Sequence, residues 1–346
     1  MVSPSTKIGI GVIGVGSIAL DHASAILQLG HSIVAACATS EDSPRWKQFK
    51  KIAPEARFFS DIDALLEDTD IEAIVVCLPW FVTEGVLAKL LVSSKRILIE
   101  KPVALSANTL EDLLDLPGID VSNKIVGFNR RFYSSVQTLK ERINKGGIKT
   151  VEISISESVA RLGKKFGPSI IPNILVYNSC HILDTSIYLL GELKLLKNYN
   201  LSKSKKSLSF QSSFSLLETD SGVPVSLIIT EENPLPVGIR VLFDDETTWH
   251  LSPMEQLNVF KGYDVVDPVD GVNIRKYVPR KILTVVEDNE FKPGFLEQMN
   301  FFLEGHQSNL NANLPEHLRL LKFIESLSVI DSKLKKNLIS SIKSFN

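Results

Sequence analysis

The stretch that decides the fold is KIGIGVIGVGSIAL, residues 7–20, in which a short apolar run passes directly into a glycine-rich turn. Residues 14–19 read GVGSIA, which is the pattern G-x-G-x-x-A. Glycines in such a loop allow a tight turn and close approach to a pyrophosphate, while a following helix supplies free N–H groups. We therefore predict that a dinucleotide binds here. The predicted contacts are Gly14, Gly16, Ser17, Ile18 and Ala19.

Around this loop, short continuous apolar runs alternate with amphipathic segments as far as residue 126. The runs include SIVAACA, EAIVVCLP, RILIEKP and NKIVGF. Helices are predicted between them at residues 17–30, 43–52, 61–67, 82–93 and 106–116. Because this alternation is typical of a parallel sheet covered on both faces, we predict a doubly wound α/β Rossmann domain over residues 1–125.

The pattern changes after about residue 148. Segments such as VEISISESV, PVSLIITEE and GIRVLFDDETTWHLS alternate with period two, which indicates an antiparallel sheet with one buried face. We predict a second α+β domain, residues 126–346, with an open and mostly antiparallel sheet. One helix is expected from an N-cap at Asn173 to a stop at Gly191, and a C-terminal helix at about 315–345.

Composition restricts the partners. Of the 346 residues, 44% are hydrophobic and 23% charged, the balance of a folded protein of two domains. A net charge of −2 disfavours nucleic acid and anionic membranes. Without a leader or an apolar window of about 18 residues, we expect a cytoplasmic protein. Scattered histidines and three isolated cysteines predict no metal site.

The second apolar run bears on the choice of cofactor. It ends in AACATSED, with Ala38 where an acidic residue would bind the adenosine ribose of NAD. A 2′-phosphate would meet no carboxylate there, and Thr39 and Ser40 could hydrogen-bond it, with Arg45 within reach. The sequence thus favours NADP, whereas the acidic pair at 41–42 leaves NAD open.

A third motif, E-K-P at residues 100–102, follows the run RILI. In an open parallel sheet, ligands bind beyond the carboxyl ends of the strands. Alone, the tripeptide is more typical of a solvated pair before a loop. Together with the glycine loop, a strand ending in Pro79, and VGFNRRF at 126–132, it resembles the Gfo/Idh/MocA family of NAD(P)-dependent oxidoreductases.

The likeness covers most of the chain, including residues 57–79 and 317–332. It implies a Rossmann domain followed by an open antiparallel sheet, in agreement with the patterns above. It further implies an NAD(P)-dependent dehydrogenase or reductase that transfers hydride between the nicotinamide and a hydroxyl or ketone carbon of a sugar, nucleotide-sugar or cyclitol. A homodimer or homotetramer formed through the C-terminal sheet is expected with it.

The resemblance also implies roles for single residues. Lys101 corresponds to the family's catalytic-site lysine, which would stabilise negative charge on a substrate oxygen, and a cis bond to Pro102 would hold it. The other positions implied near the cofactor or substrate are Pro79, Glu100, Asn129, Arg130 and Arg131. For the two arginines, surface ion pairing is the alternative.

The segment YNSCHILDTSIYLLG, residues 177–191, places Tyr177, His181 and Asp184 on one helical stripe. By itself, a histidine and aspartate at this spacing would be a buried pair that anchors a helix. The resemblance favours a site, because His181 and Asp184 match a family pattern whose histidine exchanges the hydroxyl proton. Asn178 and Asp184 would then position hydroxyl groups of the substrate.

Tyr177 departs from that pattern, because many members have aspartate there. Three readings remain open: Tyr177 exchanges the proton with Lys101 lowering its pKa, it shapes the pocket for another substrate, or the chemistry is lost. The last reading gives a catalytically silent NAD(P)-binding sensor as an alternative function. A reductase of a non-sugar carbonyl or imine is another, because function depends on the site and not on the fold.

Overall fold

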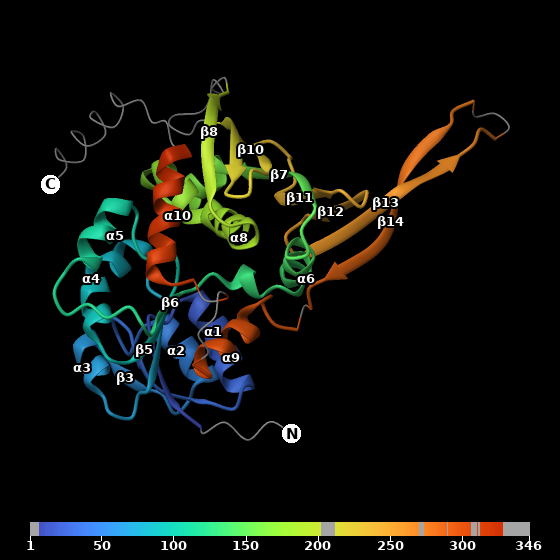
Figure 1. The fold of residues 1–346 in the computed structure, drawn as a ribbon. Helices are drawn as coiled ribbons and strands as arrows, with labels where there is room; N and C mark the ends of the chain where they lie inside the picture. Colours follow the sequence, from blue (N-terminus) through green and yellow to red (C-terminus); the bar gives the residue numbers. More distant parts are fainter. Residues whose placement is uncertain are drawn as a thin grey trace.

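Six strands near the N-terminus form a parallel sheet in the computed structural model, which describes residues 7–201, 212–269, 273–288, 290–305, 310 and 312–327 (Figure 1). The elements are β1 (Gly9–Ile13), α1 (Ser17–Gln28), β2 (Ser32–Cys37), α2 (Pro44–Ile52), β3 (Arg57–Phe59), α3 (Ile62–Glu67), β4 (Ala73–Val76), α4 (Trp80–Val92), β5 (Arg96–Ile99), α5 (Ala107–Leu114) and β6 (Lys124–Val126). The strand order is β3-β2-β1-β4-β5-β6, so the predicted doubly wound Rossmann sheet is confirmed.

Three of the helices begin one residue after the predicted start, because the predicted first residue is the N-cap. The Ser43 hydroxyl accepts a hydrogen bond from the Trp46 N–H at 3.1 Å. Asp61 and Ser106 cap α3 and α5 in the same way. These side chains satisfy N–H groups that have no partner within the helix.

The order of the strands reverses at β1, which pairs with β2 on one side and with β4 on the other. Connections leave β1 and β4 toward opposite edges of the sheet, so a crevice opens beyond their carboxyl ends. The glycine loop after β1, Pro79 after β4 and Lys101 after β5 are therefore neighbours on one edge.

The second half of the chain forms an eight-stranded sheet in the order β14-β13-β12-β11-β7-β10-β9-β8. Its elements are η1 (Asn129–Phe132), α6 (Ser134–Ile143), β7 (Ile148–Glu157), α7 (Val159–Phe166), η2 (Pro168–Asn173), η3 (Leu175–Ser179), α8 (Cys180–Leu190), β8 (Leu193–Asn200), β9 (Ser213–Thr219), β10 (Pro224–Glu231), β11 (Gly238–Phe243), β12 (Thr247–Leu251), β13 (Gln256–Val266), β14 (Lys276–Val286), α9 (Phe295–Leu303) and α10 (Leu314–Leu327). Only β7 and β10 pair in parallel, so the predicted open, mostly antiparallel sheet is confirmed.

The two faces of this sheet differ. Along β7, Val151, Ile153 and Ile155 are fully buried and share one hydrophobic core with Leu183 of α8. The residues between them point to the other face, where Glu152 pairs with Arg240 of β11 at 2.6 Å. Helices thus cover one face, and the other carries exposed polar groups.

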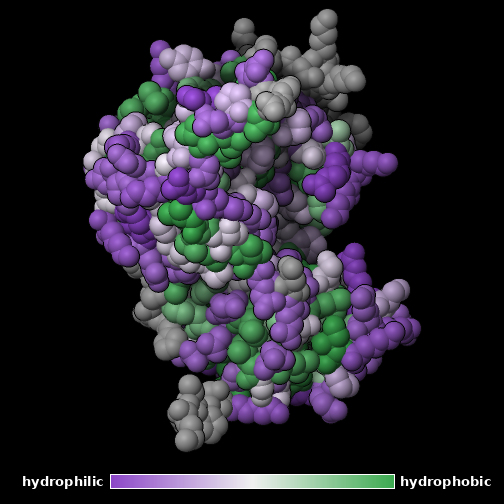
Figure 2. Space-filling model, turned by 90° about the vertical axis from the view of Figure 1, so that its right-hand side faces the viewer, coloured by the Kyte–Doolittle hydropathy of each residue, from purple (hydrophilic) through white to green (hydrophobic). Residues whose placement is uncertain are grey.

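The strands β13 and β14 extend beyond the sheet as a projecting hairpin (Figure 1). Several of its large apolar side chains are more than half exposed, including Tyr263, Ile274, Tyr277 and Val286. Figure 2 views the molecule from the side on which the hairpin projects and shows hydrophobic residues exposed among hydrophilic ones. Exposed apolar surface of this extent is typical of an interaction site.

The segment predicted as one helix over residues 173–190 is three helical pieces. Asn173 ends the 3₁₀ helix η2 and is not an N-cap, because the chain stays helical through Ile174. The next piece, η3, is a π-helical turn, and α8 follows without a break. The predicted stop at Gly191 is confirmed, with a φ of 84° that favours glycine.

The C-terminal part of the chain returns to the Rossmann sheet. Helix α9 packs on α1, and its Met299 and Phe302 belong to the same core as Ala19 and Ile26. Ala312 forms a bridge with Val126 at the end of β6. The division of the chain into domains of residues 1–125 and 126–346 stays a prediction. The predicted C-terminal helix is described to Leu327, and the rest of its predicted range lies outside the described residues.

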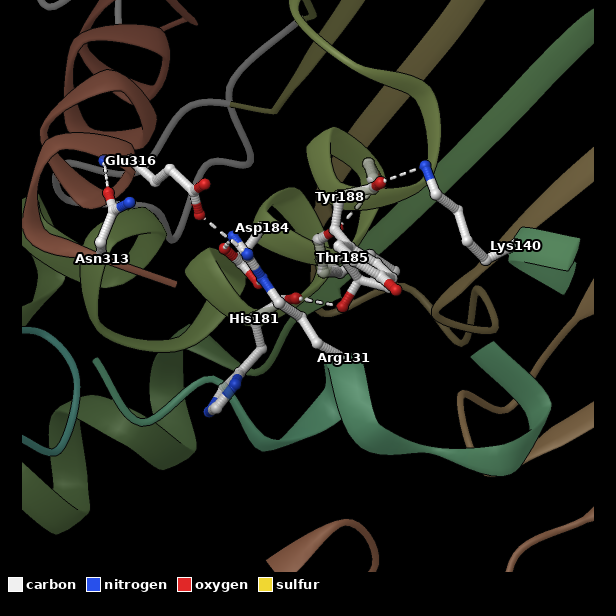
Figure 3. A network of polar contacts seen from close by, with 10 residues as sticks. Arg131, Lys140, His181, Asp184, Thr185, Tyr188, Asn313 and Glu316 are labelled. Atoms are coloured by element: carbon white, nitrogen blue, oxygen red, sulfur yellow. Dashed lines mark hydrogen bonds and ion pairs between the residues drawn. The ribbon is translucent and has the colours of Figure 1, made fainter. Parts of the chain in front are cut away.

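Arg131 joins three helical elements in the interior (Figure 3). Its guanidinium donates two hydrogen bonds to Asp184 of α8, at 2.9 and 2.6 Å, and one to Glu316 of α10 at 2.9 Å. The side chains of Arg131 and Asp184 are each only 4% exposed. Burial by itself lowers the pKa of Arg131, but the two carboxylates outweigh it and raise that pKa. The pair is therefore structural, not the surface ion pair considered for this arginine.

Replacing Arg131 with methionine should lower the free energy of unfolding by about 3–5 kcal/mol, because it leaves the buried Asp184 carboxylate uncompensated. Urea denaturation measures the loss. Lys322→Met is the control. Lys322 lies on α10, as Glu316 does, but its ion pair with Glu111 of α5 is exposed, so this substitution should lower the free energy of unfolding by less than about 1 kcal/mol. The double variant Arg131→Met/Asp184→Leu should recover part of the lost stability. Equal losses for Arg131→Met and Lys322→Met would contradict the structural role of the buried pair.

Candidate active site

A cavity of about 530 Å³ lies at the carboxyl edge of the Rossmann sheet, where residues of both halves of the chain meet. Several predicted site residues line it together: Ile18, Pro79, Glu100, Lys101, Asn129, Arg130, Tyr177 and His181. They come from the start of α1, from the loops after β4 and β5, and from η1, η3 and α8. The structure thus brings together residues that are up to 163 positions apart, from Ile18 to His181.

The glycine loop has the geometry that a pyrophosphate needs. Gly14 has a φ of 87°, and a Cβ there would lie 2.8 Å from the Cys77 carbonyl oxygen. Nothing lies within 4 Å of the place where a Cβ on Gly16 would stand, so the space over the loop is open. Helix α1 begins there with no side-chain cap and no acidic residue in its first turn. Its N–H groups and dipole are therefore available to an anion.

The residues predicted for the adenosine end lie beside this loop. The Gly14 N–H donates to the Cys37 carbonyl at 2.9 Å, which holds the loop against the end of β2. Thr39 and Ser40 follow directly and are exposed. The Ser40 hydroxyl accepts a hydrogen bond from the Asp42 N–H at 3.2 Å. This edge therefore presents hydroxyls, with the carboxylates two residues further on.

Lys101 is held between the end of β5 and η3. Its ammonium donates to the Tyr177 carbonyl at 3.1 Å and lies 5.4 Å from the centroid of the Tyr177 ring. Such a position over a ring face is favourable for a cation. The Lys101–Pro102 peptide bond is cis, as predicted. Only the outer part of the ammonium is left to meet a ligand in the cavity.

Glu100 has a partner that sequence reasoning missed. His22 of α1 lies with its Nε2 at 2.8 Å from a Glu100 carboxylate oxygen, and its ring is fully buried. The ring also packs on Phe295 of α9, with the centroids 4.7 Å apart. The only available signal was the position of His22 one turn after Ala19, on the face of α1 that turns toward the strand ends.

The catalytic histidine candidate is neutral in the structure. Burial lowers the pKa of His181 well below its usual value, and the positive charges of Lys101, Arg130 and Lys292 lower it further. Its Nδ1 atom is buried and has no hydrogen-bond partner among the described residues. Neutral imidazole is the form that can accept a proton.

The pKa of Tyr177 argues against one of the three readings left open for this residue. That reading required Lys101 to lower the pKa of the phenol, but burial raises it, and the nearby Cys180 raises it further. The contact with Lys101 runs through the ring face and the backbone carbonyl and not through a charged phenolate. A phenol with a raised pKa is a poor proton acceptor near neutral pH.

Two of the predicted substrate contacts point elsewhere. Asp184 is buried against Arg131 and does not line the cavity, and in Figure 3 the His181 ring points away from that pair. Asn178 lines a neighbouring cavity and donates to Glu157 of β7 at 2.8 Å. Asp184 follows His181 by three residues within α8, but the Arg131 guanidinium binds it in the interior. The Asn178 amide is held by Glu157 at the end of β7.

The further residues that line the cavity were not singled out from the sequence. They are Leu78, Trp80, Phe81, Tyr133, Phe166, Glu255, Lys292, Pro293 and Phe295. Lys292 pairs with Asp21 of α1 at 3.2 Å and lies 4.6 Å from the centroid of the Phe295 ring. It therefore adds a third cation to the cavity, after Lys101 and Arg130, on the side of α1.

The strand order, the glycine loop and the cavity at the switch point together define a dinucleotide-binding protein with a second, sheet-containing half. Residues 8–117 match the model of the GFO_IDH_MocA family, described as "Oxidoreductase family, NAD-binding Rossmann fold". The resemblance to the Gfo/Idh/MocA oxidoreductases is thereby confirmed over residues 8–117.

Curated relatives match part of the chain. Inositol 2-dehydrogenase of Leifsonia xyli is 29% identical over 150 residues, 42% of this chain and 42% of that protein. Inositol 2-dehydrogenase of Paracoccus denitrificans is 35% identical over 138 residues, 39% of this chain and 40% of that protein. The chain thus matches less than half the length of these relatives.

Solved structures extend the likeness in fold to nearly the whole chain. A dehydrogenase from Chromobacterium violaceum has a TM-score of 0.72 at 16% identity, over 98% of this chain and 99% of that one. Among the described helices, none is both long and apolar enough to cross a membrane. Within the described residues, no three His, Cys, Asp or Glu side chains converge in a way that could hold a metal ion.

A second buried histidine lies behind the site. His317 of α10 is 1% exposed, and neither ring nitrogen has a hydrogen-bond partner among the described residues. Its ring packs on Phe128, which also contacts His181, with centroid distances of 5.6 and 6.0 Å. Burial, aided by the charges of Arg131 and Lys101, lowers the pKa of His317 to about 3.

This pKa predicts a pH-dependent stability. The unfolded histidine binds its proton near pH 6.5 and the folded one only near 3, so the folded state loses stability as the pH falls between these values. His317→Met should remove this contribution, about 1.4 kcal/mol per pH unit, while leaving stability at pH 7.5 unchanged or higher. Urea denaturation from pH 7.5 to 5 measures how the free energy of unfolding depends on pH in the wild type and in His317→Met. The same dependence in both proteins would refute the prediction.

Proposed function

We propose that the protein is an NAD(P)-dependent oxidoreductase that transfers hydride between the nicotinamide and a hydroxyl or ketone carbon of a sugar-like polyol. The observation that carries this proposal is the convergence of Lys101, Tyr177 and His181 in one cavity beyond the glycine loop. The inositol 2-dehydrogenase relatives support a polyhydroxylated ring, such as a cyclitol, sugar or nucleotide-sugar, as the substrate class.

The residues that line the cavity are proposed to have different roles, which follow from their charges. A bound nicotinamide cofactor supplies the hydride acceptor or donor. Lys101 would hold the reacting oxygen and stabilise negative charge on it, because its ammonium is preorganised by the Tyr177 carbonyl. His181, neutral at physiological pH, would accept the hydroxyl proton. Asn129 and Arg130 would orient the substrate from the opposite side of the cavity.

Tyr177 is proposed as a positioning residue and not as the proton acceptor. Its raised pKa opposes proton exchange, while its ring and carbonyl both contact Lys101. This role explains why tyrosine can stand where many family members have aspartate. The lysine, and not the histidine, is the group that Tyr177 orients.

For the cofactor we propose NADP over NAD. The open space over Gly16 and the uncapped start of α1 would take the pyrophosphate, with Ser17, Ile18 and Ala19 opening the helix. Pro79 and Glu100 would border the nicotinamide half. Thr39 and Ser40, with no carboxylate at position 38, would meet the ribose 2′-phosphate.

The assembly proposed is a homodimer or homotetramer formed through the C-terminal sheet. Its face opposite the helices carries exposed side chains such as Glu152 and Arg240, and the β13–β14 hairpin carries exposed apolar side chains beyond it (Figures 1 and 2). A sheet face and hairpin of this kind need a partner to remove apolar surface from water.

Replacing Lys101 with methionine should lower kcat by about a hundred- to a thousand-fold, because a preorganised charge on the reacting oxygen is lost. Cofactor affinity should change little. NAD(P)H absorbance with a panel of cyclitols, sugars and nucleotide-sugars measures the rate, and fluorescence quenching measures cofactor binding. The control is Lys89→Met, because Lys89 is an exposed residue of α4 paired with Asp63.

In the same assay, Tyr177→Phe should keep most of the rate, because the ring and the carbonyl that contact Lys101 remain. A rate as low as that of Lys101→Met would instead assign proton exchange to the phenol. Cofactor binding without turnover of any panel member would support the silent sensor in place of the enzyme.

Introducing a carboxylate by Ala38→Asp should shift the ratio of the NADP and NAD dissociation constants toward NAD by about tenfold or more, through repulsion of the 2′-phosphate. Ala38→Asn is the control for size at this half-buried position. Fluorescence titration with both cofactors measures the ratio. An unchanged ratio in Ala38→Asp would place the 2′ position elsewhere.

A further inference from the structure

A second cavity, of about 540 Å³, adjoins the first. It lies at the end of β7, and the two cavities share Arg130 and Glu255 in their walls. Only these two side chains belong to both linings, so they separate two adjacent spaces of similar size. A ligand larger than one ring can therefore extend from the first cavity past Arg130 into the second.

Glu157 is the distinctive residue of the second cavity. It is 1% exposed, and its carboxylate accepts hydrogen bonds from the Asn178 amide at 2.8 Å and from the Ser179 hydroxyl. Among the described residues, no lysine, arginine or histidine forms an ion pair with it. Burial raises the pKa of this carboxyl, against the hydrogen bonds from Ser179 and Asn178 and the charges of Arg161 and Arg130. A buried carboxylate without a cation is costly unless a ligand pairs with it.

The π-helical turn η3 connects the two cavities. Tyr177 lines the first cavity, and the next two residues, Asn178 and Ser179, line the second. The same turn thus orients Lys101 through Tyr177 and Glu157 through Asn178 and Ser179. A substrate that spans both cavities would meet both charged groups from one rigid element.

The balance of charge among the residues that line the second cavity favours a cationic group. Its wall contains the carboxylates of Glu157 and Glu255 and the guanidinium of Arg130. Burial, helped by Arg240, lowers the pKa of His250, so this imidazole adds no positive charge near neutral pH. One carboxylate of the wall therefore exceeds its cations, and Glu157 is the more deeply buried of the two. The charge of Arg161 also acts on Glu157, but this arginine is exposed and does not line the cavity.

We propose that the two cavities hold one substrate, an amino-substituted polyol whose reacting ring lies beside Lys101 and whose protonated amino group binds Glu157. The inference rests on the proposed function, and it narrows the substrate class from polyols in general to amino sugars or aminocyclitols. A hydroxyl at the same place would also donate to the carboxylate, but it would leave the buried charge unpaired.

Matched ligand pairs test the proposal by binding, without turnover. The full chain, saturated with reduced cofactor so that no oxidation occurs, is titrated calorimetrically with glucosamine and kanosamine against glucose, and with scyllo-inosamine against scyllo-inositol. The amine should bind about 10- to 100-fold more tightly in at least one pair, as expected for a charge-assisted hydrogen bond in a buried site. Equal affinities in every pair, or no binding of any amine, would overturn the proposal.

Glu157→Gln then assigns the preference to this carboxylate. Glutamine has the same shape, and it can accept from Asn178 while donating to Ser179, so the anchor of η3 is kept. The preference for the amine should disappear in this variant, and a preference that survives would overturn the assignment. Glu141→Gln, at an exposed position of α6, should keep the full preference.

A further binding experiment uses only the wild-type protein, so it does not depend on the folding of a variant. N-Acetylation removes the ammonium charge, so the wild-type protein should bind N-acetylglucosamine more weakly than glucosamine wherever glucosamine shows the preference. Tighter binding of the acetylated ligand would overturn the proposal. These binding results can be told apart from a failure of the proposed function. A rate unaffected by Lys101→Met would refute the catalytic role of Lys101, whereas the preference for the amine is measured by binding alone.

Discussion

The pairing of Arg131 with Asp184 and Glu316 is the interaction on which the site depends. Its three charges lie in the interior, where separation of a cation from its carboxylates is costly, so the three helical elements keep one arrangement. Arg131 is the neighbour of Arg130, and Asp184 lies one turn after His181. The pair therefore sets the position of the proposed proton acceptor relative to the segment that crosses between the domains (Figure 3).

From this anchor the electrostatics of the cavity follow. Burial, aided by the charges of Lys101, Arg130 and Lys292, lowers the pKa of His181 well below its usual value, and no acidic residue occupies the first turn of α1. The cavity is thus positive on the side where an anionic dinucleotide would lie. On the far side of Arg130, the second cavity is lined by two carboxylates, of which the buried Glu157 forms no ion pair among the described residues. The guanidinium of Arg130 thus lies between a cavity lined by cations and a cavity lined by carboxylates. This arrangement suits a substrate with a reacting hydroxyl at one end and a cationic group at the other.

Much of the fold could be predicted because its signals are local. The glycine loop, the apolar runs and the helices near residues 43–52 and 106–116 depend on residues close in sequence, and all of them are present in the structure, with Ser43 and Ser106 as N-caps in place of first helical residues. Lys101 and Pro79 were found for the same reason, since strand ends of a parallel sheet meet at one edge. The helix over 173–190 was less predictable, because a π-helical turn changes which side chains share a face.

The sequence by itself therefore determined the Rossmann domain, the open sheet and the group of residues at the strand ends, since periodicity and backbone conformation are set by neighbouring residues. The tertiary structure alone decided that Asp184 pairs with Arg131, that His22 pairs with Glu100, and that Asn178 supports Glu157 in a second cavity. Each of these contacts joins residues 21 to 78 positions apart. Their partners are set by burial and charge pairing in the folded interior, which no local pattern encodes.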